Sequence, residues 1–348
     1  MWRAGSGADR VGVHDMRAPP PIFVACALLA AAGAPLAARA GDPFLIRNDQ
    51  PVGRLYGVPV CVDADPAAAP GFGLRVGLDV ANDSIERTAG PTELVLDGET
   101  WVLRLAARHV WNNGWRVMAG IPVVSHQGGG TDSFIEEYHD AMGLPDGNRK
   151  RRPADRLEYR YRRGSEIHFN QTDSTTGVGD LFVAAAAPLA SDSAGTRALD
   201  VVAGVELPTG DADRLLGSGS WDFSLGLAAA DFATLAKWNL EVHCGAGVLA
   251  MTEGDVLADF QEPVAVYGDL AVGWRLASWL VPRVQVDFHS PFFADTGQAP
   301  LDDWAVELVC GATVRLPGRF ALDLAVAEDV AVNTAPDVVF HVGLKRSL

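Results

Sequence analysis

Apolar and polar residues alternate along most of the chain after residue 70. In residues 281–290 one face of the predicted element is polar, and the opposite face is apolar, with Pro282, Val284, Val286 and Phe288. A period of two is typical of a β-strand whose two faces meet different surroundings. Similar segments recur, and we count twelve predicted strands, each of roughly 9–14 residues, long enough to cross a bilayer at a tilt. The chain is therefore predicted to be all-β.

Two architectures fit this alternation, a water-soluble β-sandwich and a closed barrel in a membrane. The polar faces are rich in Gly and carry single charges of both signs, whereas a sheet that faces water usually carries dense Lys, Glu and Thr. Outside an N-terminal stretch, no uncharged run approaches 18 residues, so spanning helices are excluded. Membrane insertion would then require a closed barrel, in which every backbone group is paired.

The lengths of the connections favour the barrel. Short connections are predicted at 111–115, 277–278 and 317–318, and moderate ones near 189–196 and 230–236. Longer polar connections are predicted between them, at about 83–98, 125–177, 209–219, 251–262, 290–302 and 329–335. This alternation is typical of outer-membrane barrels, which have short periplasmic turns and long outer loops. We predict an antiparallel up-and-down transmembrane β-barrel over residues 71–348, with both chain ends on the periplasmic side.

Aromatic residues gather near the short connections. The aromatic girdle of a membrane protein would place them there, and ordinary packing within hairpins is the alternative explanation. The residues concerned are Trp111, Trp115, Trp274, Trp279 and Phe320.

The N-terminal region carries an export signal. Residues 22–38 form an uncharged, Ala-rich stretch that follows Arg17 and ends in the small-residue pattern Ala38-Arg39-Ala40. This is the pattern of a signal peptide, so residues 1–40 are predicted to be removed before Gly41. Met16 offers an alternative start, which would make residues 1–15 an over-called extension. Residues 41–70 are predicted to lie in the periplasm or in the lumen.

Charge and motifs exclude several classes of function. With 28 basic and 44 acidic residues the net charge is −16, which argues against nucleic acid as a partner. We find no phosphate loop, no dinucleotide fingerprint and no Cys/His metal spacing, so no cofactor and no metal are expected. No Gly-x-Ser-x-Gly elbow occurs, and His243 and His289 are assigned to the lumen face, so we predict no catalytic residue.

The long connection at 125–177 contains two features of interest. Three glycines and a capping residue precede an apolar stripe with helical spacing, which predicts a short helix from about residue 131 to 142. Asp132, Glu136 and His139 share one face of this helix; this face could hold a metal or a proton relay, and a solvated helix face is the alternative. A basic cluster follows, in which two tyrosines are interleaved, and it is a candidate contact for lipopolysaccharide phosphates or an anionic solute, with a solvated loop as the alternative. Its members are Arg149, Lys150, Arg151, Arg152, Arg156, Arg160, Arg162 and Arg163.

Several strings resemble an uncharacterised bacterial family, a domain of unknown function of the outer-membrane β-barrel type. They are PFLIRNDQP from Pro43, LDGET from Leu96, IEEYHDAMGLPDGNR from Ile135, GVGDL from Gly177, ELPTGD from Glu206, GSGSWD from Gly217 and EDVAVNTAPDVVF from Glu328. The resemblance implies a Gram-negative envelope protein of barrel type. It implies no assigned activity and no catalytic residues, and it includes residues 43–70 in the domain.

Together these features predict an outer-membrane barrel that acts as a narrow, porin-like channel for small solutes. A non-conducting, surface-binding barrel that acts through residues 125–177 is the alternative, and an outer-membrane lipid hydrolase is a third hypothesis. Outer-membrane lipid and lipopolysaccharide are the expected partners, and the pattern leaves the oligomeric state open. The predicted lumen-lining residues are Arg75, Asp79, Arg104, Arg108, Arg116, Asp200, Glu206, Asp269, Arg275, Arg283, Asp287, Glu307, Arg315 and Asp323.

Overall fold

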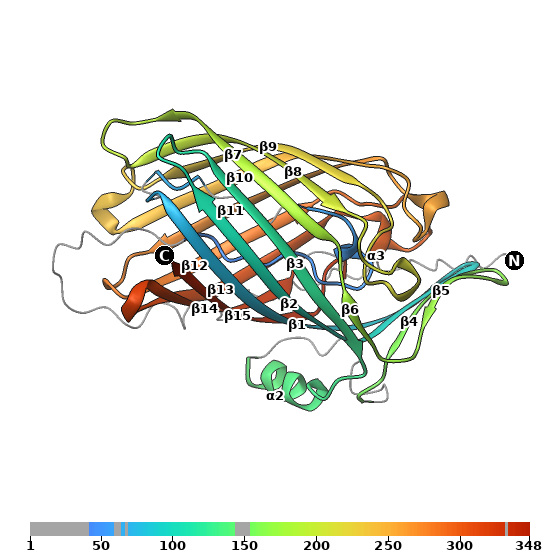
Figure 1. Cartoon of the computed structure of the whole chain (residues 1–348). Coiled ribbons are helices and arrows are strands. Elements are labelled where there is room, and N and C mark those ends of the chain that lie inside the picture. Colours follow the sequence, from blue (N-terminus) through green and yellow to red (C-terminus); the bar gives the residue numbers. More distant parts are fainter. Residues whose placement is uncertain (1–41, 59–63, 67–68, 143–153, 331–332) are drawn as a thin grey trace, which may run out of the picture.

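The computed structural model describes residues 42–58, 64–66, 69–142, 154–330 and 333–348. In these ranges twelve antiparallel strands form the wall of a β-barrel (Figure 1). They are β1 (Gly71–Ala89), β2 (Thr92–Val110), β3 (Arg116–Gln127), β7 (Leu181–Ser191), β8 (Arg197–Leu207), β9 (Asp222–Asp231), β10 (Leu240–Met251), β11 (Val264–Trp274), β12 (Leu280–His289), β13 (Ala305–Leu316), β14 (Phe320–Asp329) and β15 (Val338–Ser347).

The barrel closes where its first and last strands pair. β1 and β15 are antiparallel, in a register that runs from Gly73 opposite Ser347 to Asn82 opposite Val338. Every other wall strand pairs with the wall strands before and after it in the chain, including β3 with β7. Closure leaves no unpaired sheet edge in the wall, which is what a hydrocarbon environment requires. The predicted fold class, a closed barrel of twelve antiparallel strands, is confirmed.

The two faces of the wall have opposite chemistry. Outward positions carry large apolar side chains that are exposed, such as Leu225 at 56% and Leu270 at 48%. Inward positions carry charged side chains that are buried, such as Asp79 at 0% and Asp200 at 1%. This arrangement is the reverse of a soluble protein, in which exposed apolar patches of this extent are rare. None of the helices in the described ranges is long and apolar enough to cross a bilayer.

The two ends of the barrel differ. At one end, the turn end, consecutive strands are joined by short connections, such as 111–115 and 317–319. At the other, the loop end, the connections are longer, and β1 begins and β15 finishes at the turn end. The side chains of Trp111, Trp115 and Trp279 at the turn end are about half exposed, at 44%, 50% and 54%.

The region beyond the loop end differs from the prediction in two ways. The predicted connection at 83–98 is wrong, because β1 and β2 continue through it and are joined only by residues 90–91. The predicted strand length is also wrong for these two strands, which have 19 residues each. The outer part of β2 pairs with β4 (Glu158–Arg163), and β4 pairs with β5 (Glu166–Gln171), so four strands project beyond the barrel (Figure 1).

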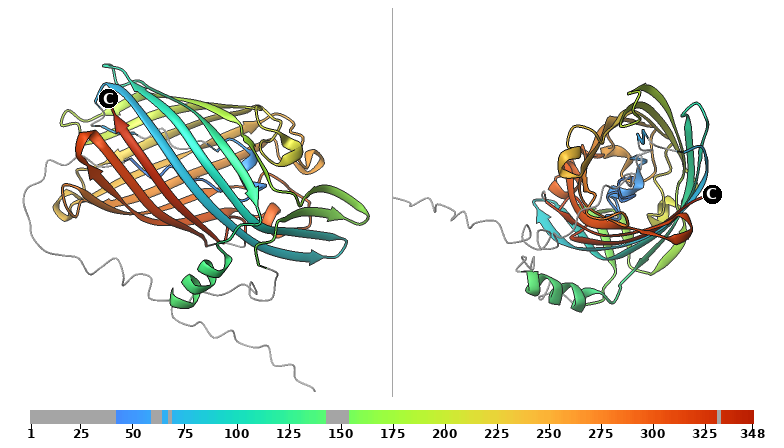
Figure 2. Two further views of the ribbon diagram at one scale, coloured as in Figure 1. Left: turned by 60° about the horizontal axis from the view of Figure 1, so that its bottom comes forward. Right: turned by 90° about the vertical axis from the view of Figure 1, so that its left-hand side faces the viewer.

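The remaining elements lie in connections. The predicted short helix is confirmed as α2 (Asp132–Met142), which lies outside the barrel wall (Figure 2). A short strand, β6 (Thr175–Val178), pairs with the end of β3. The other helical turns are η1 (Gly53–Leu55), η3 (Ala212–Arg214), η4 (Ala236–Trp238), η5 (Ala258–Phe260), α3 (Ala299–Asp302) and η6 (Pro317–Arg319).

An apolar core closes the loop end. Long connections at this end, β4 and residues 52–56 contribute side chains to it, and Tyr159 and Tyr161 are fully buried there. Each fully buried aliphatic or aromatic side chain stabilises this apolar core by about 1.5–3 kcal/mol. The middle of the barrel is instead lined by charged and polar groups.

Candidate functional site

The lumen contains residues 42–58, which we call the plug (Figure 2). The plug begins near the turn end, where Asp42 contacts the wall, and it extends to the loop end. There the ring of Tyr56 packs against Phe292 and Phe293, with centroid distances of 5.1 and 5.7 Å. Ala64, before β1, is buried in a cluster with side chains of β3, β7, β8 and β9. The sequence left residues 41–70 in the periplasm or the lumen, and the described part of the plug lies in the lumen.

Ion pairs fix the plug to the wall at three levels. They join Asp42 to Arg75 and Arg108, Arg47 to Glu206, and Asp49 to Arg104. Arg104 also pairs with Asp79, which in turn contacts Nδ1 of His341 on β15. Most of these groups are buried, and the side chains of Arg108 and Asp42 are exposed by only 14% and 16%, so a charge that loses its partner stays in a poorly solvated place. Removing one partner of such a pair costs about 3–5 kcal/mol.

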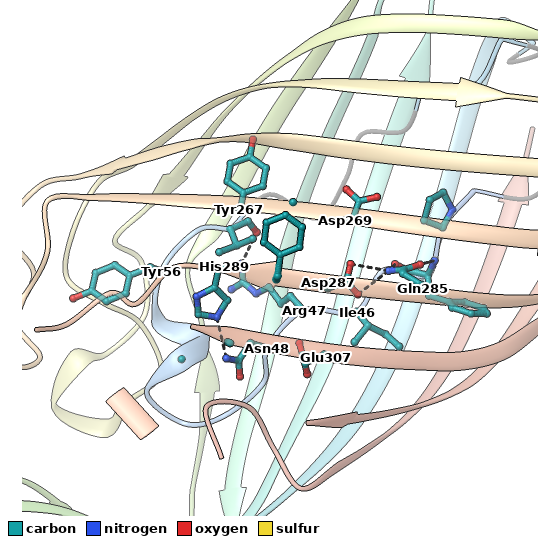
Figure 3. Close-up of a pocket in the computed structure, with 17 residues that line it drawn as sticks. Ile46, Arg47, Asn48, Tyr56, Tyr267, Asp269, Gln285, Asp287, His289 and Glu307 are labelled. Carbon is teal, nitrogen blue, oxygen red and sulfur yellow. Dashed lines mark hydrogen bonds between the residues drawn. The ribbon is translucent and has the colours of Figure 1, made fainter. Parts of the chain in front are cut away.

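Neutral hydrogen bonds add to the ion pairs. The side-chain amide of Gln285 accepts from the backbone N–H of Phe44 at 2.9 Å and donates to its carbonyl at 3.2 Å. Gln285 thus pairs with the plug as a neighbouring strand would. The Nδ2 of Asn48 donates to the Thr334 carbonyl at 2.8 Å and lies 3.0 Å from Nε2 of His289 (Figure 3). The plug is therefore bound along its length.

Four titratable groups of the plug have shifted pKa values, and Asp42 and Arg54 show how burial and neighbouring charges combine. Burial opposes ionisation of Asp42, but the guanidinium groups of Arg75 and Arg108 outweigh it and hold the pKa of Asp42 well below its ordinary value. Burial, together with the charge of Arg47, lowers the pKa of Arg54 to about 10. Both groups therefore remain charged at neutral pH.

A small cavity of about 40 Å³ lies between the plug and β11, β12 and β13 (Figure 3). Three carboxylates border it from adjacent strands, with Asp269 opposite Asp287 and Asp287 opposite Glu307. Gln285 donates to Asp287 at 2.9 Å. A cavity of this size holds only a few water molecules, so it is too small for an organic solute.

The structure places the predicted lumen residues as follows. All of them except Arg275 stand at inward positions of wall strands, and Arg275 lies in the turn directly after β11. Some of them pair with one another, as Arg116 does with Asp200. Arg283 pairs with Glu241 at 3.2 Å, and its Nη1 also donates to the plug, to the carbonyl of Asp42 at 2.6 Å. The plug thus contacts several of the predicted residues.

The predicted basic cluster falls into two parts. Arg149, Lys150, Arg151 and Arg152 lie outside the described residues. The other four are engaged at the loop end: Arg156 pairs with Asp97 and Glu158, Arg160 with Glu93 and Glu158, and Arg162 with Glu93, while Arg163 donates to the carbonyl of Asp295. The carboxylates of β2 and β4 therefore neutralise most of the positive charge of this described part.

The described residues that were considered for chemistry lie apart from one another. His243 and His289 face the lumen and are buried at 3% and 7% exposure. Asp132 accepts a hydrogen bond from Nδ2 of Asn82 at 3.1 Å. The side chains of Glu136 and His139 lie outside the described part of the structure.

Comparisons with known proteins agree with this geometry. A family profile described as "Protein of unknown function (DUF3187)" matches residues 21–347. The chain belongs to this family. No match was found among curated protein sequences.

Solved structures resemble the fold of this family member. The crystal structure of the COG4313 outer membrane channel from Pseudomonas putida F1 has a TM-score of 0.55 and 14% identity, and the match covers 82% of this chain and 98% of that chain. The NanC porin has a TM-score of 0.44 and 10% identity, covering 80% and 100%, and the KdgM porin has 0.42 and 8%, covering 79% and 99%. The first likeness shows an outer-membrane type of barrel fold.

Sequence reasoning missed the residues that hold the plug, namely Asp42, Arg47 and Asp49. They occur in a segment without a period of two, so the alternation gave no information about their surroundings. One signal was present, because the string PFLIRNDQP carries two opposite charges among apolar residues, next to a barrel whose inward face is charged. Charged residues of an ordered segment in such a place need partners on the wall.

Proposed function

We propose that this protein is exported to the outer membrane and forms a narrow, porin-like channel for small solutes, closed in the present state by the plug. The observation that carries the proposal is the charged lumen, in which residues 42–58 are held by ion pairs to inward residues of several strands. A non-conducting barrel that binds partners through its surface loops does not require a charged lumen, since buried ion pairs contribute little net stability compared with apolar packing. A lining of paired charges suits a path that water and solutes enter when the plug moves.

The orientation follows from the same proposal. The turn end faces the periplasm and the loop end faces outward, as in other outer-membrane barrels. The exposed apolar wall contacts lipid, and the basic cluster at 149–163 lies near the lipopolysaccharide phosphates. The export signal at residues 1–40 directs the chain to this membrane.

The test is single-channel conductance in planar bilayers, with full-length protein purified in detergent and checked for folding by its shift on unboiled gels. We expect small, infrequent openings from the wild type. Asp49→Asn removes one charge that holds the plug while Arg104 keeps Asp79 as a partner, so openings are expected to become several times more frequent. Deletion of residues 42–58 should give a larger and more constant current.

The matched control is Asp231→Asn. Asp231 pairs with Arg197 at 3.1 Å near the turn end, but both side chains are exposed at 34% and 52%, so this pair does not hold the plug. Its removal should leave the current unchanged. If folded wild type, Asp49→Asn and the deletion variant all pass no current, the channel is rejected and the non-conducting, surface-binding barrel replaces it.

A further inference from the structure

A cavity of about 490 Å³ lies at the turn end of the barrel, bordered by the ends of β1, β2, β13 and β15. Four basic side chains reach it from inward positions of the wall, namely Arg75, Arg108, Arg315 and Lys345. Two acidic residues border it, Asp42 and Asp65. The chain as a whole has 28 basic and 44 acidic residues, so this excess of positive charge is opposite to that of the molecule. Positive charge is therefore concentrated where the lumen opens.

Two further basic residues, Arg319 and Arg346, also border the cavity. The guanidinium of Arg346 lies 4.9 Å from the ring centroid of Phe320, at an outward position of the wall. Lys345 lies 2.8 Å from Asp323, which also accepts a hydrogen bond from Thr313 at 2.7 Å. Asp323 therefore compensates the charge of Lys345. Among the inward-facing basic groups, the arginines attract an anion in the cavity most strongly.

Two of these arginines already bind an anion. The carboxylate of Asp42 pairs with Arg75 and lies 3.3 Å from Nη1 of Arg108. Two guanidinium groups that converge on one carboxylate form the arrangement that recognises carboxylates and phosphates in general. The anion in this case belongs to the plug itself.

We propose that Arg75 and Arg108 form a binding site for small solutes that carry carboxylate or phosphate groups, and that the Asp42 carboxylate occupies this site while the plug is in place. The inference rests on the proposed channel function, because it names the class of solute that the channel takes. A solute that binds the two arginines must displace Asp42, and it therefore removes one of the ion pairs that hold the plug. An anion that binds more tightly to the protein with a displaced plug than to the protein with the plug in place then shifts the equilibrium toward the open state.

Isothermal titration calorimetry tests the site on full-length protein in detergent, with citrate and inorganic phosphate as probes. Each arginine contributes a charge-assisted contact, so Arg75→Gln and Arg108→Gln should each weaken binding by about tenfold or more. The control is Arg197→Gln, which removes a positive charge near the turn end from a residue outside the cavity. If both arginine variants bind the probes as the wild type does, the site is rejected.

If Asp42 competes with the probes for the two arginines, its removal should strengthen binding, whereas the arginine variants weaken it. Asp42→Asn removes the internal carboxylate, so both probes should bind several times more tightly than to the wild type. Asp323→Asn removes the same charge beside the same cavity, from a carboxylate that pairs with Lys345 and Thr313 instead of with the two arginines, and it should give a much smaller gain. Equal gains from the two variants would mean that only the general potential of the cavity matters, and would overturn the competition.

The two probes separate the sources of the oxyanion. Binding of both probes supports the shared chemistry, binding of citrate alone assigns the site to carboxylates, and binding of phosphate alone assigns it to phosphates; binding of neither rejects it. Binding in detergent and conductance in bilayers are measured independently. A protein that binds citrate but passes no current contradicts the channel and keeps the site, whereas a conducting protein that binds neither probe contradicts the site alone.

Discussion

At the scale of single residues, a tyrosine in the lumen depends on two glycines. Tyr267 on β11 is 7% exposed, and its side chain lies across Gly247 on β10 and Gly226 on β9, which are consecutive cross-strand neighbours. A Cβ atom on Gly247 would lie 2.4 Å from the Tyr267 hydroxyl, and one on Gly226 would lie 2.8 Å from it. The tyrosine can occupy this position because neither neighbour carries a side chain.

We predict that Gly247→Val destabilises the barrel by about 1–3 kcal/mol, because the valine forces Tyr267 out of its position in the core of the loop end. The measurement is urea unfolding in lipid vesicles, followed by tryptophan fluorescence. Ala246→Val is the control, since Ala246 is the outward-facing neighbour and an added methyl group there meets no packed side chain. In the Tyr267→Ala background, Gly247→Val should cost much less than it does in the wild type. Equal stability of Gly247→Val and wild type would contradict the argument.

The face of a residue was predictable from the sequence, and its partner was not. The period of two places Asp79 on the polar face of β1, and the structure agrees. The groups that bind this carboxylate, Arg104 and His341, come from two different neighbouring strands, and His341 lies 262 residues away in the chain. Partners across a barrel depend on strand register, which alternation along one strand does not determine.

At the scale of elements, one carboxylate docks the segment that leads into α2. Oε1 of Glu99, on β2, accepts hydrogen bonds from the backbone N–H of Gly130 at 3.0 Å and of Thr131 at 2.7 Å. Its Oε2 accepts from Nε1 of Trp101 at 2.8 Å. Glu99 is fully buried, so if its carboxylate were removed, water could not take its place as the hydrogen-bond acceptor of these groups. The position of α2 beside the wall therefore depends on this residue.

We predict that Glu99→Ala releases α2 from the wall, because each hydrogen bond to a buried charged group contributes about 1.5–3 kcal/mol. Limited proteolysis of the protein in vesicles should then cleave the segment around α2 several times faster than in the wild type. Glu137→Ala alters an exposed acidic residue of α2 and is expected to leave the cleavage rate unchanged. Equal rates for Glu99→Ala and wild type would show that other contacts hold the helix.

The outer part of the β1–β2 hairpin was predicted wrongly for a physical reason. Residues 92–100 of β2 are almost all buried, because β4 and the segment before α2 cover this part of the hairpin. With both faces covered, polar and apolar residues need not alternate, and here the apolar run of residues 94–96 is followed by the polar run of residues 97–100. Without a period of two, the segment was taken for a polar loop. The sequence left the plug open between the periplasm and the lumen, because its extended backbone is stabilised by side chains of the wall and has no periodicity of its own.

At the scale of the whole molecule, distant segments meet around the plug at the loop end. Glu206, at the start of ELPTGD, pairs with Arg47, and Asp222, at the end of GSGSWD, accepts from the backbone N–H of Gly57 at 2.7 Å. The segment EDVAVNTAPDVVF supplies the Thr334 carbonyl that Asn48 binds. Movement of the plug would therefore break contacts with the ends of β8 and β9 and with the connection between β14 and β15 at the same time.

The outer surface gives the last prediction, which tests the medium around the barrel. Leu225 lies in the middle part of β9, points outward and is 56% exposed, and Leu227 on the same strand is 50% exposed. If hydrocarbon surrounds this face, Leu225→Arg places a charge in lipid and should reduce the stability of the protein in vesicles by about 2–4 kcal/mol. If water surrounds it, the same change on an exposed position should fall within about 0.5 kcal/mol of neutral.

Urea unfolding in vesicles measures the difference, and Leu225→Ala separates the loss of the leucine from the arrival of the charge. Alanine keeps the position apolar, so it should cost much less than arginine in lipid. In water the two substitutions should be close to each other, because neither side chain loses solvation there. A Leu225→Arg variant as stable as the alanine variant would contradict a lipid-facing wall, and the channel, whose path exists only if the wall spans a membrane, would be rejected with it.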